Sequence, residues 1–349
     1  MGTYIKLFET TAEYTAYTAS NEFITPNVSL CEDAPTMLHY SPYVDIETRI
    51  VAKFNVTNTN SATQIMSISA TSQFSEIEID DVVQPSVVST YIFNTTGEHT
   101  VKYTLTNPTS IGYQAFYQCT SLTSIDIPNS VTSIGIEAFK DCTSLTSINI
   151  PNSVTSIGNG AFNGCYSLTS ITIPSGVTSI DSAVFNMCTS LTSIDIPNTV
   201  TSIGYGAFSN CSSLTSIDIP NTVTSIGQYA FSNCISLTSI VIPSGVTSIQ
   251  NGTFSMIDGC SLTSVTIGSG VTSIGQYAFS NCSSLTSIVI PSGVTSIGSG
   301  AFSDCINLTS INIPSSVISI GDYAFAYCEN LDSTSISAIS AINPTALES

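Results

Sequence analysis

The chain has 349 residues, of which 42% are hydrophobic and only 8% are charged, and its formal net charge is −19. This composition supplies a large core, and Ser, Thr and Asn rather than charged side chains must keep the surface hydrated. The negative charge repels phosphate, which argues against a nucleic-acid partner, and no apolar run is long enough to predict membrane insertion.

The first 43 residues mix aromatic and polar side chains, with prolines at positions 26, 35 and 42. This pattern predicts an extended segment. The opening sequence MGTYIKLFETTAEY lacks the apolar core of a secretory signal and contains Glu9 and Glu13. We therefore expect the protein to be made in the cytoplasm of the cell that produces it.

Short motifs in this segment resemble the opening of virion proteins from crAss-like tailed bacteriophages. The motifs are YIKLF (4–8), EY (13–14), PNVS (26–29), CED (31–33) and HYSP (39–42). The resemblance implies that residues 1–43 anchor the chain to other virion proteins and that the protein is located on the virion. The anchor candidates are Tyr4, Lys6, Phe8, Asn27, Cys31, His39 and Tyr40.

Residues 44–106 contain several short runs of β-branched and aromatic residues, separated by Asn, Ser, Gly and Pro. They predict about five antiparallel strands in a small immunoglobulin-like sandwich that ends before Asn107 and Pro108. Glu76, Glu78 and Asp80 alternate with isoleucines and should share one solvated face, on which a calcium site is an alternative interpretation.

Residues 107–331 repeat a unit of 23 residues that is interrupted once, between Phe254 and Phe279. A period of this length predicts a solenoid, here a mainly β one of about ten coils. In one unit, Ile125 and Ile127 alternate with polar residues and predict a strand that pairs in parallel with its copies in neighbouring coils. Residues 332–349 depart from the repeat and predict a C-terminal cap or tail.

The repeat follows the pattern L-x-x-I-x-I-P-x-x-V-x-x-I-G-x-x-A-F-x-x-C. This pattern resembles that of the BspA-type leucine-rich repeat family. The resemblance implies a parallel solenoid that serves as a binding or adhesion surface, and it implies no particular substrate.

The repeat contains one cysteine per coil, which predicts a column of buried thiols that pack as small hydrophobic groups. Parallel Cβ directions and the missing secretory signal argue against disulfides. A straight column also does not offer the four convergent ligands that zinc requires. We therefore predict no metal site and no cofactor.

Candidate ligand-binding residues are those that vary within the fixed frame of the repeat. The outward strand position is occupied by Asp195 and Asp218 in adjacent coils and by Val241 and Val289 further along. The acids form a solvated column that can attract a cation, and nothing near them supports a glycosidase pair. The valines indicate a contact surface.

A second column contains Tyr229, Tyr277 and Tyr323, which either stack on carbohydrate or pack against the next coil. No catalytic constellation is present, because the repeats contain no histidine, and we predict that the protein is not an enzyme.

The sequence thus favours a virion structural protein, a head or tail fibre or a capsid decoration protein. Its solenoid would adhere to glycans or proteins of a host surface or of mucus. The alternatives are a bacterial cell-surface adhesin and a spacer that binds nothing. Because fibres are often multimers, a homo-oligomer such as a trimer is a further expectation.

Overall fold

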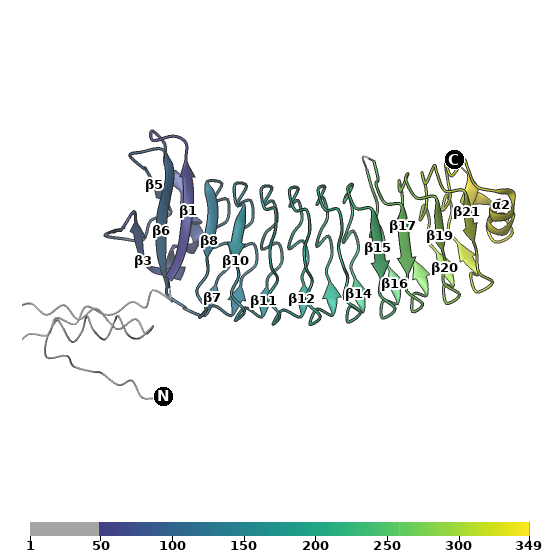
Figure 1. Cartoon of the computed structure of the whole chain (residues 1–349), viewed down its shortest axis with the longest axis horizontal. Coiled ribbons are helices and arrows are strands. Elements are labelled where there is room, and N and C mark those ends of the chain that lie inside the picture. The colour runs from purple at the N-terminus through teal and green to yellow at the C-terminus, as the bar shows by residue number, and fades with distance from the viewer. Residues whose placement is uncertain (1–48, 258, 349) are drawn as a thin grey trace, which may run out of the picture. The chain divides into compact units, whose positions relative to one another are not determined.

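The computed structural model describes residues 49–257 and 259–348, in which the regular elements are mainly short strands joined by turns (Figure 1). The strands before the repeats are β1 (Arg49–Val56), β2 (Thr63–Gln64), β3 (Phe74–Ile79), β4 (Val82–Val83), β5 (Thr90–Tyr91) and β6 (Gly97–Leu105). A 3₁₀ helix, Ile68–Gln73, precedes β3. The chain ends in helix α2 (Ser333–Ser340) and a second 3₁₀ helix, Pro344–Leu347.

Each repeat contributes up to two strands to a parallel solenoid, which confirms the predicted architecture. The first set comprises β8 (Leu122–Asp126), β10 (Ser147–Asn149), β15 (Ser239–Ile242), β17 (Ser264–Ile267), β19 (Ser287–Val289) and β21 (Ser310–Asn312). The second set comprises β7 (Ser110–Ile111), β9 (Ser133–Ile134), β11 (Ser156–Ile157), β12 (Ser179–Ile180), β13 (Ser202–Ile203), β14 (Ser225–Ile226), β16 (Ser248–Ile249), β18 (Ser273–Ile274), β20 (Ser296–Ile297) and β22 (Ser319–Ile320).

The strands pair in a register that places equivalent residues side by side. Ile125 pairs with Ile148 and Asp126 with Asn149, one full repeat apart, so every repeat position becomes a column along the solenoid. Threonine columns complete the backbone hydrogen bonding, since both the amide and the hydroxyl of Thr146 donate to the carbonyl of Thr123, at 3.0 and 3.1 Å. These columns explain how a chain with few charges keeps a polar surface.

A column of ten phenylalanine rings forms the centre of the core. From Phe116 to Phe325, successive rings stack with centroids 5.2 to 5.7 Å apart and with nearly parallel planes. The longer repeat does not interrupt this column, because Phe254 stacks on Phe231 and Phe279 at 5.5 and 5.3 Å. The inserted residues are accommodated beside it, with Met256 buried and Ile257 exposed.

Residues 49–105 form a cap on the first coil, in place of the separate immunoglobulin-like sandwich expected from the sequence. Strand β1 pairs antiparallel with β6 on one side and with β8 of the solenoid on the other, within one sheet of order β10-β8-β1-β6-β3-β4. Residues 107 and 108 therefore do not divide two sheets. The cap covers the open edge of β8, which would otherwise expose unpaired backbone groups.

The acidic residues of β3 and its following turn are paired with basic side chains. Glu76 and Glu78 contact Arg49 at 2.7 and 2.8 Å, and Asp80 contacts His99 at 2.6 Å. The acidic side chains that prompted the calcium interpretation are thus already engaged by Arg49 and His99.

The C-terminal segment covers the last coil. Asp332 caps helix α2 by accepting a hydrogen bond from the amide of Ser335, and Ile339 and Ala346 are buried. The buried Ser335 hydroxyl bonds both the amide and the carbonyl of Ile311, so the last strand of the first set retains polar partners. No helix in the described residues is long and apolar enough to cross a membrane.

Candidate functional site

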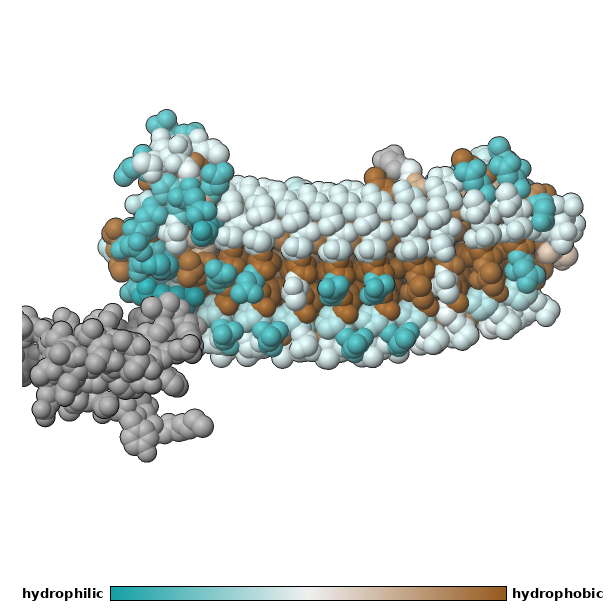
Figure 2. All heavy atoms as spheres, viewed as in Figure 1, coloured by the Kyte–Doolittle hydropathy of each residue, from teal (hydrophilic) through white to brown (hydrophobic). Residues whose placement is uncertain are grey.

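The outward side of the first strand set forms one long face of the solenoid, which we call the strand face. Figure 2 shows an apolar stripe along this face with hydrophilic positions interspersed. The stripe comes from the paired isoleucines of each repeat, such as Ile148 and Ile217, whose edges reach the surface between the outward side chains. The outward row itself is Asp126, Asn149, Thr172, Asp195, Asp218, Val241, Thr266, Val289 and Asn312.

The two acids of this row lie in adjacent coils, as the sequence predicted. Thr172, Asp195 and Asp218 form consecutive parallel bridges, and both carboxylates are exposed. A shallow depression of about 210 Å³ borders Asp195. Within residues 49–257 and 259–348, no three His, Cys, Asp or Glu side chains are grouped to hold a metal ion.

The two valines of the row are the most apolar outward groups on the strand face. The exposed fraction is 59% for Val241 and 75% for Val289. Val241 pairs with Thr266 in the next coil, and Val289 lies in the coil after that, next to Asn312. The two valines lie on either side of Thr266 along the row. Together with the isoleucine edges, they add exposed apolar surface to the C-terminal half of the strand face.

The tyrosine column lies on the loop edge, away from the strand face. Tyr229, Tyr277 and Tyr323 have positive φ of 54 to 60°, and their side chains are 39 to 53% exposed. The rings of Tyr229 and Tyr277 lie over Gly252 and Gly300 of the following coils, where a Cβ atom would collide with the ring. Each of these two rings therefore packs against the next coil and also presents exposed area to solvent.

Sequence reasoning did not anticipate the pairing of Tyr229 with Tyr205 of the preceding coil. Their ring centroids lie 5.7 Å apart in an edge-to-face arrangement, beside a depression of about 300 Å³. Gly206 leaves this depression open. The sequence does contain a signal for this arrangement, because Gly and Tyr alternate from coil to coil at the repeat position of Gly206 and Tyr229.

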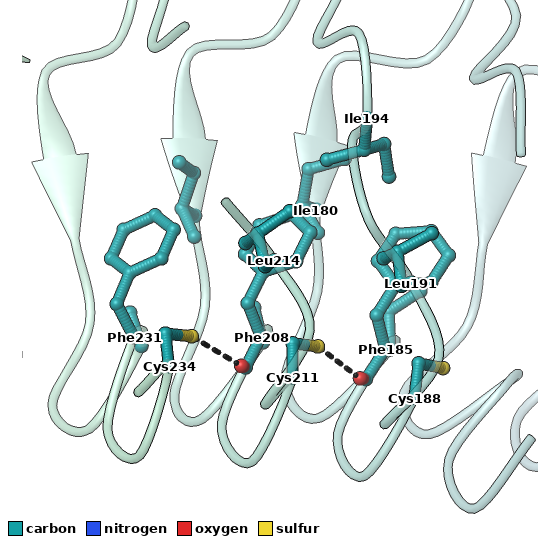
Figure 3. Close-up of a cluster of buried hydrophobic side chains, with 14 of the residues drawn as sticks. Ile180, Phe185, Cys188, Leu191, Ile194, Phe208, Cys211, Leu214, Phe231 and Cys234 are labelled. Atoms are coloured by element: carbon teal, nitrogen blue, oxygen red, sulfur yellow. Dashed lines mark hydrogen bonds between the residues drawn. The ribbon is translucent and has the colours of Figure 1, made fainter. Parts of the chain in front are cut away.

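The cysteine column consists of free, buried thiols, as predicted. Figure 3 shows Cys211 and Cys234 donating to the carbonyl oxygens of Phe185 and Phe208, at 3.1 and 3.2 Å. Burial raises the pKa of these thiols, for Cys234 to about 12. Such thiols are chemically inert.

Cys260, in the longer repeat, is the exception. A hydrogen bond from the Cys282 thiol lowers the pKa of Cys260 to about 7, and its Sγ also accepts from the amide of Leu262 at 3.4 Å. It is less deeply buried than Cys282.

The anchor candidates Tyr4, Lys6, Phe8, Asn27, Cys31, His39 and Tyr40 lie outside the described residues. Their proposed role stays a prediction.

A family model for the BspA-type leucine-rich repeat region matches residues 109–220, 178–259 and 256–349. These matches together cover more than half of the chain. The chain belongs to the BspA-type leucine-rich repeat family. No curated protein matches the sequence.

Solved structures of similar sequence include three leucine-rich repeat proteins. A leucine-rich repeat protein of T. pallidum is 26% identical over 63% of this chain and 83% of its own, with a TM-score of 0.40. A leucine-rich repeat protein from Bacteroides ovatus is 28% identical over 69% of this chain and 83% of its own, with a TM-score of 0.34. A leucine rich cell surface protein from Faecalibacterium prausnitzii is 30% identical over 67% of this chain and 85% of its own, also with a TM-score of 0.34.

Proposed function

We propose that this protein is an adhesion protein that presents the strand face to a protein or glycan of a host surface. The observation that carries the proposal is the exposure of Val241 and Val289 within an apolar stripe. Exposed apolar area of this kind is typical of interaction sites. The depression on this face is shallow, at about 210 Å³, which favours a large partner over an enclosed small molecule.

We propose the virion as the setting, with residues 1–43 docking on other virion proteins. The support is the resemblance of the motifs in that segment to virion proteins of crAss-like bacteriophages. The bacterial cell surface is the alternative setting, and membership of the BspA-type family fits both equally. A homo-oligomer is part of the virion proposal.

The strand face is tested by binding of fluorescent full-length protein to host cells and to mucin-coated surfaces. Replacing both Val241 and Val289 by Asp should reduce binding about tenfold or more, because charge replaces apolar contact area. The matched control replaces the exposed valines of β4, Val82 and Val83, by Asp and should leave binding unchanged. Unchanged binding in the first variant, or no binding by the native protein, contradicts the proposal.

The anchor is tested by deleting residues 1–43. The truncated protein should remain folded, because the cap and solenoid form one unit without that segment, and it should fail to join particles. Incorporation of the truncated protein into purified virions at the native level would remove the anchor assignment.

A further inference from the structure

A pocket of about 590 Å³ lies where the loop after β1 meets the edge of the first three coils. One wall comes from residues 57–64 and the other from the turns that contain Gln118, Asp141 and Tyr166. Two hydrogen bonds hold the loop against the first coils. The Gln64 side chain donates to the carbonyl oxygen of Tyr117 at 2.6 Å, and, at the end of β1 that leads into the loop, the amide of Asn55 donates to the carbonyl oxygen of Ser121 at 2.8 Å. The pocket is therefore a fixed feature of the junction between cap and solenoid.

The lining of this pocket is polar but almost uncharged. Twelve residues line it, of which nine are Ser, Thr, Asn or Gln, and the other three are Ala62, Asp141 and Tyr166. An apolar ligand would leave these groups without partners, and a peptide side chain would find only Ala62 and the Tyr166 ring as apolar contacts. An anionic ligand would meet the Asp141 carboxylate and no cation in the lining.

Asp141 is placed to accept hydrogen bonds from a ligand. It has a positive φ of 58°, and its carboxylate lies over Gly164 of the next coil, which has no side chain to obstruct it. Its backbone amide is used, donating to the carbonyl of Asn163 at 2.7 Å. A carboxylate with two oxygens can accept from two neighbouring hydroxyls at once.

Tyr166 supplies an aromatic group on the same wall. Its side chain is 38% exposed, and its backbone carbonyl is engaged by Ser190 and Thr189 of the next coil, which fixes the base of the residue. An aromatic ring next to a carboxylate and several amides offers both an apolar surface and hydrogen bonds to a polyhydroxylated ring.

We propose that this pocket binds a neutral saccharide, with Asp141 accepting from adjacent hydroxyls, Asn58 and Gln118 completing the polar contacts and Tyr166 packing against the sugar ring. The inference deepens the proposed adhesive function, on which its biological meaning rests, and it gives that function a site separate from the strand face. It predicts that neutral glycans bind better than sialylated ones, because the sialic acid carboxylate would face Asp141.

The test uses the full-length protein with lactose, maltose, N-acetyllactosamine and sialyllactose, followed by an array of neutral and sialylated glycans. Saturation-transfer NMR and calorimetry should detect at least one neutral sugar and a weaker or absent response to its sialylated form. Asp141→Asn and Tyr166→Ala should each weaken binding about tenfold or more. Asn tolerates the positive φ at this position, so the first variant keeps the fold.

Asp304→Asn is the matched control, since Asp304 occupies the same repeat position as Asp141 with a positive φ of 59°, does not line the pocket and should not change sugar binding. The variant with Asp at Val241 and Val289 should also retain it, so failure of the strand-face proposal is distinguishable from failure here. The pocket proposal is overturned if no neutral glycan binds, if both pocket variants bind as the native protein does, or if the sialylated sugars bind better than their neutral forms.

Discussion

The cap and the solenoid are joined in one sheet but are stabilised differently. In the solenoid, the regular coils repeat the same contacts, and Lys140 is its single basic residue. In the cap, individual contacts occur once: Arg49 bridges two glutamates, and the buried Tyr103 hydroxyl donates to the carbonyl of Ile65 at 2.6 Å. The comparison teaches that repetition supplies a rigid frame, whereas the unrepeated cap terminates it and shapes the neighbouring pocket.

The largest expected effect comes from breaking the solenoid's repeated core. Phe208 is fully buried and stacks on Phe185 and Phe231, so Phe208→Ala should lower the free energy of unfolding by about 3 to 5 kcal/mol. Chemical denaturation measures the loss. Val289→Ala, at an exposed position, should cost less than about 0.5 kcal/mol. A loss below about 1 kcal/mol for Phe208→Ala would show that the phenylalanine column is not the core.

The next effect concerns the reactivity of the cysteine thiols, which should be higher in the longer repeat than in the regular coils. In a Cys31→Ser background, iodoacetamide should modify Cys260 about 100-fold faster than the cysteines of the regular coils, which react only when the solenoid opens. The reactive form is the thiolate, and the pKa of Cys260 is about 7, so its rate should rise with pH up to about pH 8 and then level off. Peptide mapping measures each site, and uniform modification of all coils would contradict the account.

A smaller effect is expected from one specific contact of the cap. Tyr103→Phe removes the donor to the buried Ile65 carbonyl and should cost about 1 to 2 kcal/mol. Hydrogen exchange should show faster exchange in β1 and β6 and unchanged exchange in the central coils. Equal acceleration throughout the solenoid would mean that the cap and the coils unfold as one cooperative unit.

The smallest effect concerns the exposed ion pair between Lys53 and Glu98. Both side chains are largely exposed, so Lys53→Met should change the free energy of unfolding by less than about 0.5 kcal/mol. Thermal unfolding at low and high salt measures it. A larger loss that disappears at high salt would show that surface charge contributes to the stability of the cap.

The sequence was sufficient to predict what repeats. The phenylalanine and cysteine columns follow directly from the 23-residue period, and the adjacency of Asp195 and Asp218 follows from the parallel register. The cap was not predictable in the same way, because the alternation in β1 shows which side chains are buried but does not identify β8, about 70 residues later, as its partner.

The candidate sites also differ in whether their position follows from the repeat. The strand-face valines could be predicted to point outward because their position in the repeat is fixed. The pairing of Tyr205 with Tyr229 depends on a side-chain arrangement between coils, and the pocket with Asp141 depends on a loop from a distant part of the chain. The alternation of Gly and Tyr along the tyrosine column is a periodic signal for the first arrangement, whereas the pocket has none.

Immunogold labelling tests the central claim most directly, that this solenoid is displayed for adhesion on an outer surface. Antibody raised against residues 109–349 would be applied to purified particles and to intact and sectioned producing cells. The account predicts label on the outside of the virion; label on the bacterial surface would keep the adhesive role and replace its setting. Label confined to the interior of the producing cell would contradict the account.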